Sequence, residues 1–311
     1  SRFKILLPKE MINSEQDVTD KNNKYKHMKR ITILINCKDS KGIIASVTNF
    51  IHQQSGNIVY IDQHVDREDN MFFMRLECEF SKESFSLRVF KNVFSEVIGD
   101  KFDMSWRLHD SDKKPKMAIF VSKYEHCLYD ILSRYSANEL EVEIPLIISN
   151  HPDLEHIAKS FNIPYFCIKV TKETKQQAED EQLRLLKEHD VDFVVLARYM
   201  QVVTSKLIEE YTNQIINIHH SFLPAFPGAK PYHSAYKRGV KIIGATSHYV
   251  TEDLDEGPII EQDITHVSHT HSIKDFILKG RDLEKIVLSR ALKLHTKRKV
   301  MVFNNKTIVF N

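Results

Sequence analysis

Residues 193–197 read FVVLA, and this short stretch decides the fold of the larger part of the chain. A run that is apolar at every position is typical of a central parallel strand, because helices cover both faces of such a sheet. Upstream of it, strand-like and helix-like segments alternate. Strands are expected at 117–122, 143–149 and 165–170, and helices at 125–135, 152–161 and 174–189. The alternation predicts a doubly wound, mostly parallel α/β domain over residues 116–311.

The end of this domain has a different pattern. A long helix is expected from Ser272 to about His295, with Ser272 and Asp275 placed as a capping box. Residues 300–303 and 307–310 alternate around an Asn-Asn-Lys turn. This pattern predicts a terminal hairpin.

Residues 28–110 have a different order of strands and helices. Strands are expected at 31–37, 57–65, 71–80 and 101–109, and helices at 43–54 and 84–98. The helix at 84–98 has an apolar face that carries Phe85, Val89, Val93 and Val97. The order βαββαβ predicts a split βαβ sandwich with an antiparallel sheet. The charged segment 110–115 is the expected linker between the two domains. Residues 1–27 are polar and without periodicity, so we expect them to form a disordered or loosely attached extension.

The composition excludes several classes of protein. With 44 basic and 42 acidic side chains, the net charge of +2 gives no electrostatic footprint for nucleic acid or an anionic membrane. The apolar runs are far shorter than a membrane span. Because no cleavable apolar leader is present, we expect a cytoplasmic protein. A reducing compartment also suits the four scattered cysteines, which form no C-x-x-C pair: Cys37, Cys78, Cys127 and Cys167.

Chemically versatile side chains gather between residues 215 and 263. Asn217 and His219 alternate and therefore point the same way from the end of a strand, just before a loop that contains Pro224, Pro227 and Gly228. Asp255 lies on a second loop. An amide and an imidazole can stabilise a developing oxyanion, and a carboxylate can orient the imidazole or accept a proton from water. Spacing alone favours a structural role, because a lone Asn-x-His pair is usually structural.

The same segment resembles the folate-dependent formyltransferases, whose signature is Asn-x-His-x-Ser-x-Leu-Pro followed by Asp-x-Gly. The matching residues here are Asn217, His219, Ser221, Leu223, Pro224, Asp255 and Gly257. The strings HHSFLPAF, GATSHYVTEDLDEGPIIEQD and GRD-x-E are similar, more narrowly, to the formyltetrahydrofolate deformylase family. This resemblance extends over about residues 28–310.

The resemblance implies a Rossmann-like formyltransferase domain that hydrolyses 10-formyltetrahydrofolate to tetrahydrofolate and formate, without a metal or other cofactor. Asp255 would accept a proton from water, while Asn217 and His219 hold the formyl oxygen. The implied role is in one-carbon metabolism and purine biosynthesis. The implied folate-binding residues are Leu196, Arg198, Met200, Gln201, Val202 and Val203.

Three other functions stay open at this point. A transferase would pass the formyl group to an amine, but the turn at 121–128 lacks the glycines that cradle a phosphorylated acceptor. Ser122, Lys123 and His126 in this turn have either a direct role or, as is favoured, a structural one. In the structural alternative, Ser122 caps the helix, Lys123 is solvated, and His126 is buried with its hydrogen bonds satisfied. A metal site would need ligand spacings that the many histidines do not show. A folate or amino-acid sensor would not need Asn217, His219 and Asp255 together.

The first domain resembles the ACT family in its βαββαβ order and in the segment Asp39–Ala45. This resemblance implies a small amino-acid effector beside Asp39, Gly42 and Ile43, where free N–H groups at a helix start suit a carboxylate. The alternative is a purely structural unit that joins subunits edge to edge. In either case we expect a homo-oligomer.

Overall fold

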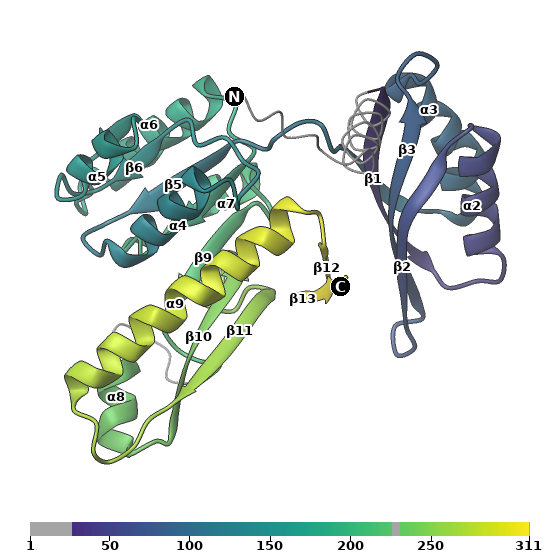
Figure 1. Cartoon of the computed structure of the whole chain (residues 1–311). Helices are drawn as coiled ribbons and strands as arrows, with labels where there is room; N and C mark the ends of the chain where they lie inside the picture. Colours follow the sequence, from purple (N-terminus) through teal and green to yellow (C-terminus); the bar gives the residue numbers. More distant parts are fainter. Residues whose placement is uncertain (1–26, 226–230, 311) are drawn as a thin grey trace, which may run out of the picture. The chain divides into compact units, whose positions relative to one another are not determined.

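The computed structural model describes residues 27–225 and 231–310. The expected extension at 1–26 and the loop residues Pro227 and Gly228 lie outside this part of the chain. The described residues form two compact units, which separate between Lys113 and Lys114. Each unit is considered by itself (Figure 1).

The first unit is a four-stranded antiparallel sheet with strand order β2-β3-β1-β4, covered on one face by two helices. Alternate strand residues such as Ile33 and Leu76 face these helices and form one apolar core. The βαββαβ order predicted from the sequence is therefore confirmed. Its elements are β1 (Met28–Lys38), α2 (Ile43–Gln53), β2 (Asn57–Asp66), β3 (Met71–Ser81), α3 (Leu87–Phe94) and β4 (Ser105–Asp110).

The second helix of this unit differs from its prediction. It begins at Leu87 because the Ser86 side chain caps it by accepting a hydrogen bond from the Val89 amide. A π-turn (Ser95–Gly99) and a 3₁₀ turn (Asp100–Phe102) then replace its expected end and the expected start of β4.

The expected buried face of this helix was also wrong. Val89 and Val97 are exposed, whereas Phe90 and Phe94 point into the core and pack on Phe50. Aromatic packing therefore sets the orientation of the helix, and the valine periodicity does not.

The second unit is a seven-stranded sheet with order β11-β10-β9-β8-β5-β6-β7. Strands β5 to β9 pair in parallel, and β10 and β11 complete the sheet antiparallel. The predicted doubly wound, mostly parallel domain is confirmed. Its strands are β5 (Met117–Val121), β6 (Ile147–Ser149), β7 (Tyr165–Cys167), β8 (Phe193–Leu196), β9 (Ile215–His219), β10 (Ile242–Tyr249) and β11 (Ile259–His266).

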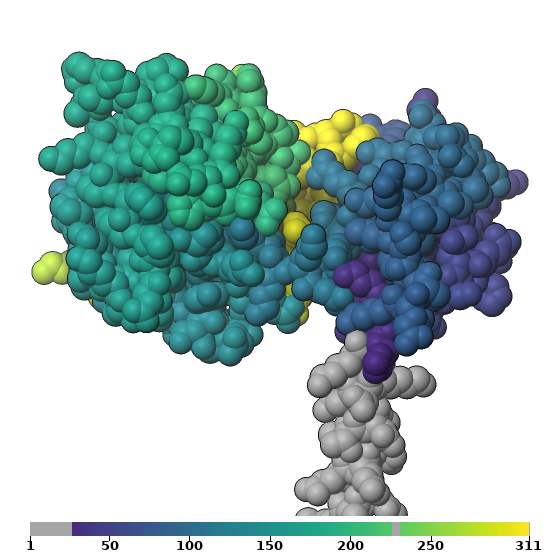
Figure 2. Space-filling view, turned by 90° about the horizontal axis from the view of Figure 1, so that it is seen from above, coloured from purple at the N-terminus to yellow at the C-terminus, as the bar shows by residue number. Residues whose placement is uncertain are grey.

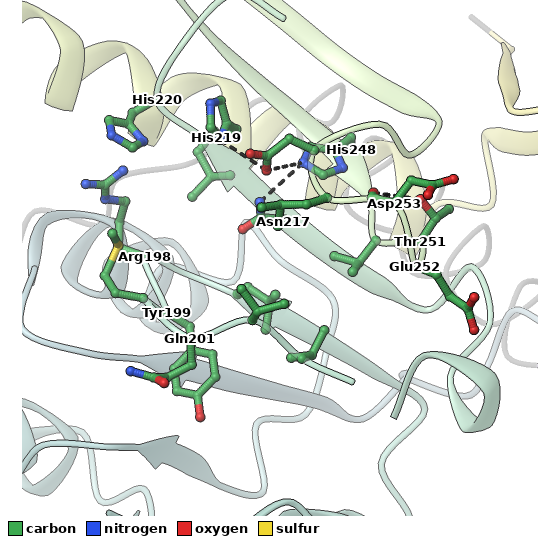
Figure 3. Close-up of a pocket in the computed structure, with 18 residues that line it drawn as sticks. Arg198, Tyr199, Gln201, Asn217, His219, His220, His248, Thr251, Glu252 and Asp253 are labelled. Carbon is green, nitrogen blue, oxygen red and sulfur yellow. Dashed lines mark hydrogen bonds and ion pairs between the residues drawn. The ribbon is translucent and has the colours of Figure 1, made fainter. Parts of the chain in front are cut away.

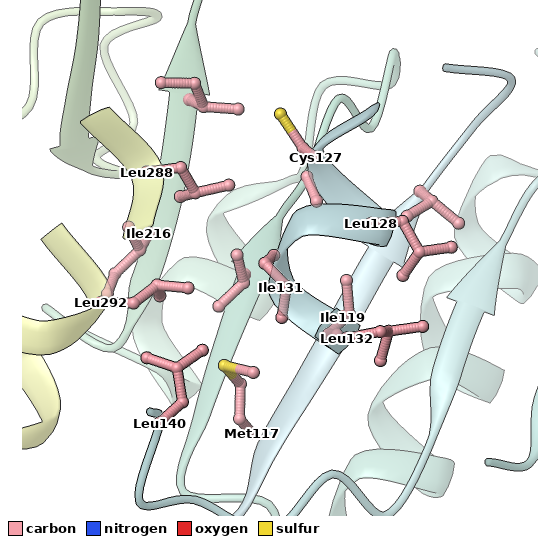
Figure 4. Packing of buried hydrophobic residues seen from close by; sticks show 14 of the residues in the cluster. Met117, Ile119, Cys127, Leu128, Ile131, Leu132, Leu140, Ile216, Leu288 and Leu292 are labelled. Atoms are coloured by element: carbon pink, nitrogen blue, oxygen red, sulfur yellow. The ribbon is translucent and has the colours of Figure 1, made fainter. Parts of the chain in front are cut away.

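Helices cover both faces of this sheet, as the apolar run 193–197 predicts. Met117 and Ile119 pack beneath α4 and α9, whereas Ala118 and Phe120 face α6 and α7 (Figure 4). On the face seen in Figure 2, the teal segments of the parallel half and the green segments that follow β9 lie against one another. The helices are α4 (His126–Ser136), α5 (Glu155–Ser160), α6 (Lys175–Glu188), α7 (Ser205–Glu210), α8 (Pro231–Arg238) and α9 (Ile273–Thr296).

Two expected strands are shorter than predicted. β6 begins only at Ile147 because Pro145, which has no N–H, cannot join the ladder. β7 ends at Cys167. The chain closes with the predicted hairpin of β12 (Val300–Phe303) and β13 (Lys306–Val309). Within the described residues, no helix combines the length and the apolar character that a membrane span requires.

Candidate active site

Two neighbouring strands and the loop that follows them bring the predicted catalytic residues together. Asn217 and His219 end β9, and β10 runs antiparallel beside it so that His248 lies opposite Asn217. Asp255 is on the loop from β10 to β11. All of these side chains reach one pocket at the carboxyl edge of the parallel strands (Figure 3).

The four side chains form one connected group. Nδ1 of His219 lies 3.2 Å from Oδ1 of Asp255, and Nε2 of His248 lies 3.8 Å from the same oxygen. Nδ2 of Asn217 lies 3.2 Å from Nε2 of His248. Asn217, His219 and Asp255 therefore belong to one group of side chains, in which His248 lies between the amide and the carboxylate.

The network around His248 fixes its tautomer. The amide of Asn217 donates, so Nε2 of His248 accepts and its proton resides on Nδ1, which donates to the Tyr249 carbonyl at 2.9 Å. Burial lowers the pKa of His248, which keeps the ring neutral at physiological pH. The second amide N–H of Asn217 is left for a ligand.

Asp255 carries the negative charge of this group. Burial alone would raise the pKa of Asp255, but the hydrogen bond from His219 and the nearby imidazoles hold it below its ordinary value. The carboxylate is therefore ionised. Its Oδ2 forms no hydrogen bond with any described residue. Nε2 of His219 is buried and has no partner in the described part of the chain, so it is free to bind a ligand.

The loop that carries Asp255 passes very close to the end of β10. A Cβ added at Gly257 would lie 1.8 Å from the Tyr249 carbonyl oxygen, so only glycine fits there. Asp255 itself has a left-handed backbone with φ of 60°. The Asp-x-Gly spacing thus has a structural cause, because the glycine permits the close approach that places the carboxylate.

The pocket has a volume of about 260 Å³, and all six expected folate-binding residues line it. Met200 and Val202 are half exposed at its wall, as in an open apolar binding site. Sequence reasoning missed the opposite wall, although the TEDLD run was part of the segment singled out. That wall is formed by Val250, Thr251, Glu252, Asp253 and Leu254.

The residues of the turn before α4 have structural contacts. Ser122 does not cap the helix as expected, since it donates to Asn150 at 2.6 Å and accepts from the Met200 amide. Lys123 is exposed. His126 is satisfied, as the structural alternative predicts, by a 2.8 Å contact with Glu284.

His126, Cys127 and Glu284 are close enough to hold a metal ion. Glu284 is already engaged by His126 and by the hydroxyl of Tyr232, at 2.6 Å. Burial raises the pKa of the Cys127 thiol well above its ordinary value, so the thiolate that a metal prefers is disfavoured. These contacts favour a packed polar cluster over a metal centre.

In the first unit, the expected effector residues Asp39, Gly42 and Ile43 line a separate pocket of about 450 Å³. Gly42 precedes α2 with φ of 90°. The structure thus brings these residues to one hollow surface at the start of the helix.

Comparison with known proteins agrees with this geometry. The family described as formyl transferase matches residues 115–292. Formyltetrahydrofolate deformylase from Synechocystis sp. is 50% identical over 279 residues, which cover 90% of this chain and 98% of the relative. The Bacillus subtilis protein of the same name is 45% identical, over 90% of this chain and 93% of its own length.

A solved structure of formyltetrahydrofolate deformylase from Pseudomonas syringae superposes with a TM-score of 0.89. It is 44% identical, and the match covers 96% of this chain and 99% of that one. The chain belongs to the formyltetrahydrofolate deformylase family.

Proposed function

We propose that the protein hydrolyses 10-formyltetrahydrofolate to tetrahydrofolate and formate, with Asn217, His219 and Asp255 as the catalytic residues. The observation that carries this proposal is the buried, unpartnered Nε2 of His219, in a pocket where Nδ1 of the same ring faces Asp255. A protonated imidazole in this position donates from Nδ1 to Asp255 and from Nε2 to an acyl oxygen.

The reaction starts with the folate in the pocket and its formyl oxygen between Asn217 and His219. Water attacks the formyl carbon and gives a proton to Asp255, so that a C–O bond forms and the oxygen becomes an oxyanion. The second N–H of Asn217 and the Nε2 proton of His219 stabilise this charge. The C–N10 bond then breaks, N10 takes the proton that Asp255 had accepted, and the second hydrogen of the water is released as formic acid ionises to formate.

The six residues predicted from the resemblance form the folate pocket in this proposal. Met200, Val202 and Val203 supply apolar walls, and the main chain near Leu196 and Arg198 offers polar groups to the edge of the pteridine. No cofactor takes part in these steps. The product, free formate, would serve one-carbon metabolism and purine biosynthesis.

The decisive experiment supplies 10-formyltetrahydrofolate without any amine and measures both tetrahydrofolate and formate. Hydrolysis predicts equal amounts of both products. A transferase would turn over only after an amine acceptor is added, and a sensor would bind folate without turnover. Bulky Tyr124 stands beside the turn where a phosphorylated acceptor would be cradled, and this supports water as the acceptor.

For the first unit, the proposal includes a small amino acid bound beside Asp39, Gly42 and Ile43. The support is the pocket at the start of α2, whose free amides suit a carboxylate. Calorimetry with a panel of amino acids tests this proposal. If no amino acid of the panel gives a heat of binding, the effector role is refuted. Assembly into a homo-oligomer is supported by the edge strand β2, where Val59 and Ile61 are exposed.

A cytoplasmic location completes the proposal. The four cysteines are all unpaired, and three of them are buried in apolar surroundings. Free buried thiols suit a reducing compartment.

A further inference from the structure

A second pocket, with a volume of about 200 Å³, adjoins the reaction pocket. Arg198 and His220 line both, so these two side chains form the partition between them. Beyond the partition, the pocket is bounded by the end of β5, the start of α4, and helices α8 and α9. The groups that matter for its chemistry are Tyr124, Tyr232, Arg281 and Glu284.

Two guanidinium groups flank a single aromatic ring in this pocket. The Arg198 guanidinium lies 4.9 Å from the centre of the Tyr124 ring, and that of Arg281 lies 5.6 Å from it. Arg198 is only 8% exposed, and its Nε has no hydrogen-bond partner among the described residues. The ring holds both cations in place but cancels neither charge.

The negative charge in this pocket belongs to Glu284, which is already bound by neighbouring side chains. Glu284 is 1% exposed and accepts hydrogen bonds from His126 at 2.8 Å and from Tyr232 at 2.6 Å. Burial would raise its pKa, but His126, Arg198 and Tyr232 together hold it below the ordinary value, so it is ionised. Arg198 shares this carboxylate at 3.4 Å, whereas Arg281 has no acidic partner in the described chain. One positive charge is therefore left over.

The reaction pocket carries negative charge on the side that faces away from the second pocket. Figure 3 shows Arg198 and His220 on one side of the Asn217–His219 group, and Glu252 and Asp253 on the other. An anion produced between them is repelled from the acidic side and attracted to the partition. Tetrahydrofolate still fills the apolar pocket at that moment.

We propose that the second pocket is a binding site for a small carboxylate and that it receives formate after hydrolysis. The formate oxygens would bind the guanidinium groups of Arg198 and Arg281 as charge-assisted hydrogen bonds. The volume of about 200 Å³ leaves room for a one- or two-carbon acid. The assignment of formate as the natural ligand rests on the proposed hydrolysis, whereas the carboxylate site itself does not.

The test uses the full-length protein without folate. [¹³C]formate is titrated at constant ionic strength, and binding is followed through its NMR line width in the wild type and in Arg281→Gln. We expect the dissociation constant to rise about tenfold or more in the variant, the usual loss for a charge-assisted hydrogen bond. Arg281→Lys, which keeps the charge without the bidentate geometry, should give an intermediate value. Lys279→Gln removes a charge from the same helix outside the pocket and should bind as the wild type does.

A second measurement links the site to turnover. Added formate should inhibit tetrahydrofolate formation, and a higher concentration should be needed in Arg281→Gln by the same factor. Equal formate binding in wild type and Arg281→Gln would overturn the site, even in an enzyme that hydrolyses its substrate normally. Arg281-dependent formate binding without hydrolysis would instead refute the proposed function and retain the carboxylate site. Tighter binding of inorganic phosphate than of formate or acetate would overturn the assignment to carboxylates.

Discussion

Asp255 places its Oδ1 3.2 Å from Nδ1 of His219, although His219 ends strand β9 and Asp255 is on the loop from β10 to β11. The contact depends on the antiparallel return of β10 beside β9, because the loop that carries Asp255 then starts next to the strand that carries His219. It also holds the imidazole so that its buried Nε2 remains available.

Asp255→Asn should lower kcat by about 100- to 10,000-fold, because an amide cannot take the proton from water. The amide oxygen can still accept from His219, so folate binding should stay near the wild-type value. Tetrahydrofolate formation and folate binding should be measured in parallel. Glu256→Gln is a matched control on the same loop, because Glu256 is exposed and does not line the pocket, and its turnover should be close to wild type. Near wild-type turnover in Asp255→Asn would remove the carboxylate from the mechanism.

His248 is expected to act as a positioning residue through Asn217. His248→Phe keeps the ring but removes the acceptor at Nε2, so the amide is no longer held toward the substrate. Because a small misplacement of such a group is costly, kcat should fall by about 10- to 100-fold with little change in KM. His248→Gln, which retains an acceptor, should restore part of the rate. A change in KM alone would contradict the positioning role.

Gly257→Ala should displace the loop that carries Asp255. The added Cβ would meet the Tyr249 backbone oxygen at 1.8 Å, and backbone cannot rotate away as a side chain can. We expect at least about a 100-fold loss of kcat and a lower Tm.

Gly239→Ala is the control, since Gly239 also has a positive φ of 71° but faces open space. It should cost about 1 kcal/mol of stability with unchanged kcat. Equal effects of both variants on kcat would refute the steric argument.

Much of the fold follows from local patterns in the sequence. The apolar run Phe193–Ala197 predicts a strand covered on both faces, and the packing of β8 agrees. The capping box of Ser272 and Asp275 is present at the start of α9. Where several aromatic rings compete for one core, the pattern fails, because Phe90 and Phe94 rather than Val89 are buried. Such a choice depends on the partner across the core, which no local window contains.

The residues of the candidate site also differ in whether a local pattern in the sequence predicts their role. Asn217 and His219 are recognisable because they alternate on one strand, and Asp255 is recognisable from its Asp-x-Gly spacing. Glu284 gave no local signal of its role, since its partners Arg198, His126 and Tyr232 come from three other segments. Only the assembled fold shows that this carboxylate is buried.

Glu284 therefore provides a prediction about stability. Glu284→Gln removes the carboxylate but leaves Arg198 charged and buried, which should cost about 3 to 5 kcal/mol of unfolding free energy at neutral pH. The pKa of Glu284 is lower in the folded protein than in the unfolded chain, where it is about 4.3. The unfolded state thus binds more protons between these two values. The stabilisation is fully present above the unfolded pKa and is lost as pH falls through the folded one.

The difference in unfolding free energy between wild type and Glu284→Gln should accordingly be constant from neutral pH down to about 4.3 and then shrink. Urea unfolding should be followed by circular dichroism, because the single tryptophan, Trp106, is in the first unit and does not report on the second. Glu139→Gln, at an exposed carboxylate paired with Lys293, is the control and should change stability little. A difference that grows as the pH falls would mean that Glu284 is protonated in the folded protein, and the charge balance assigned to the second pocket would then be wrong.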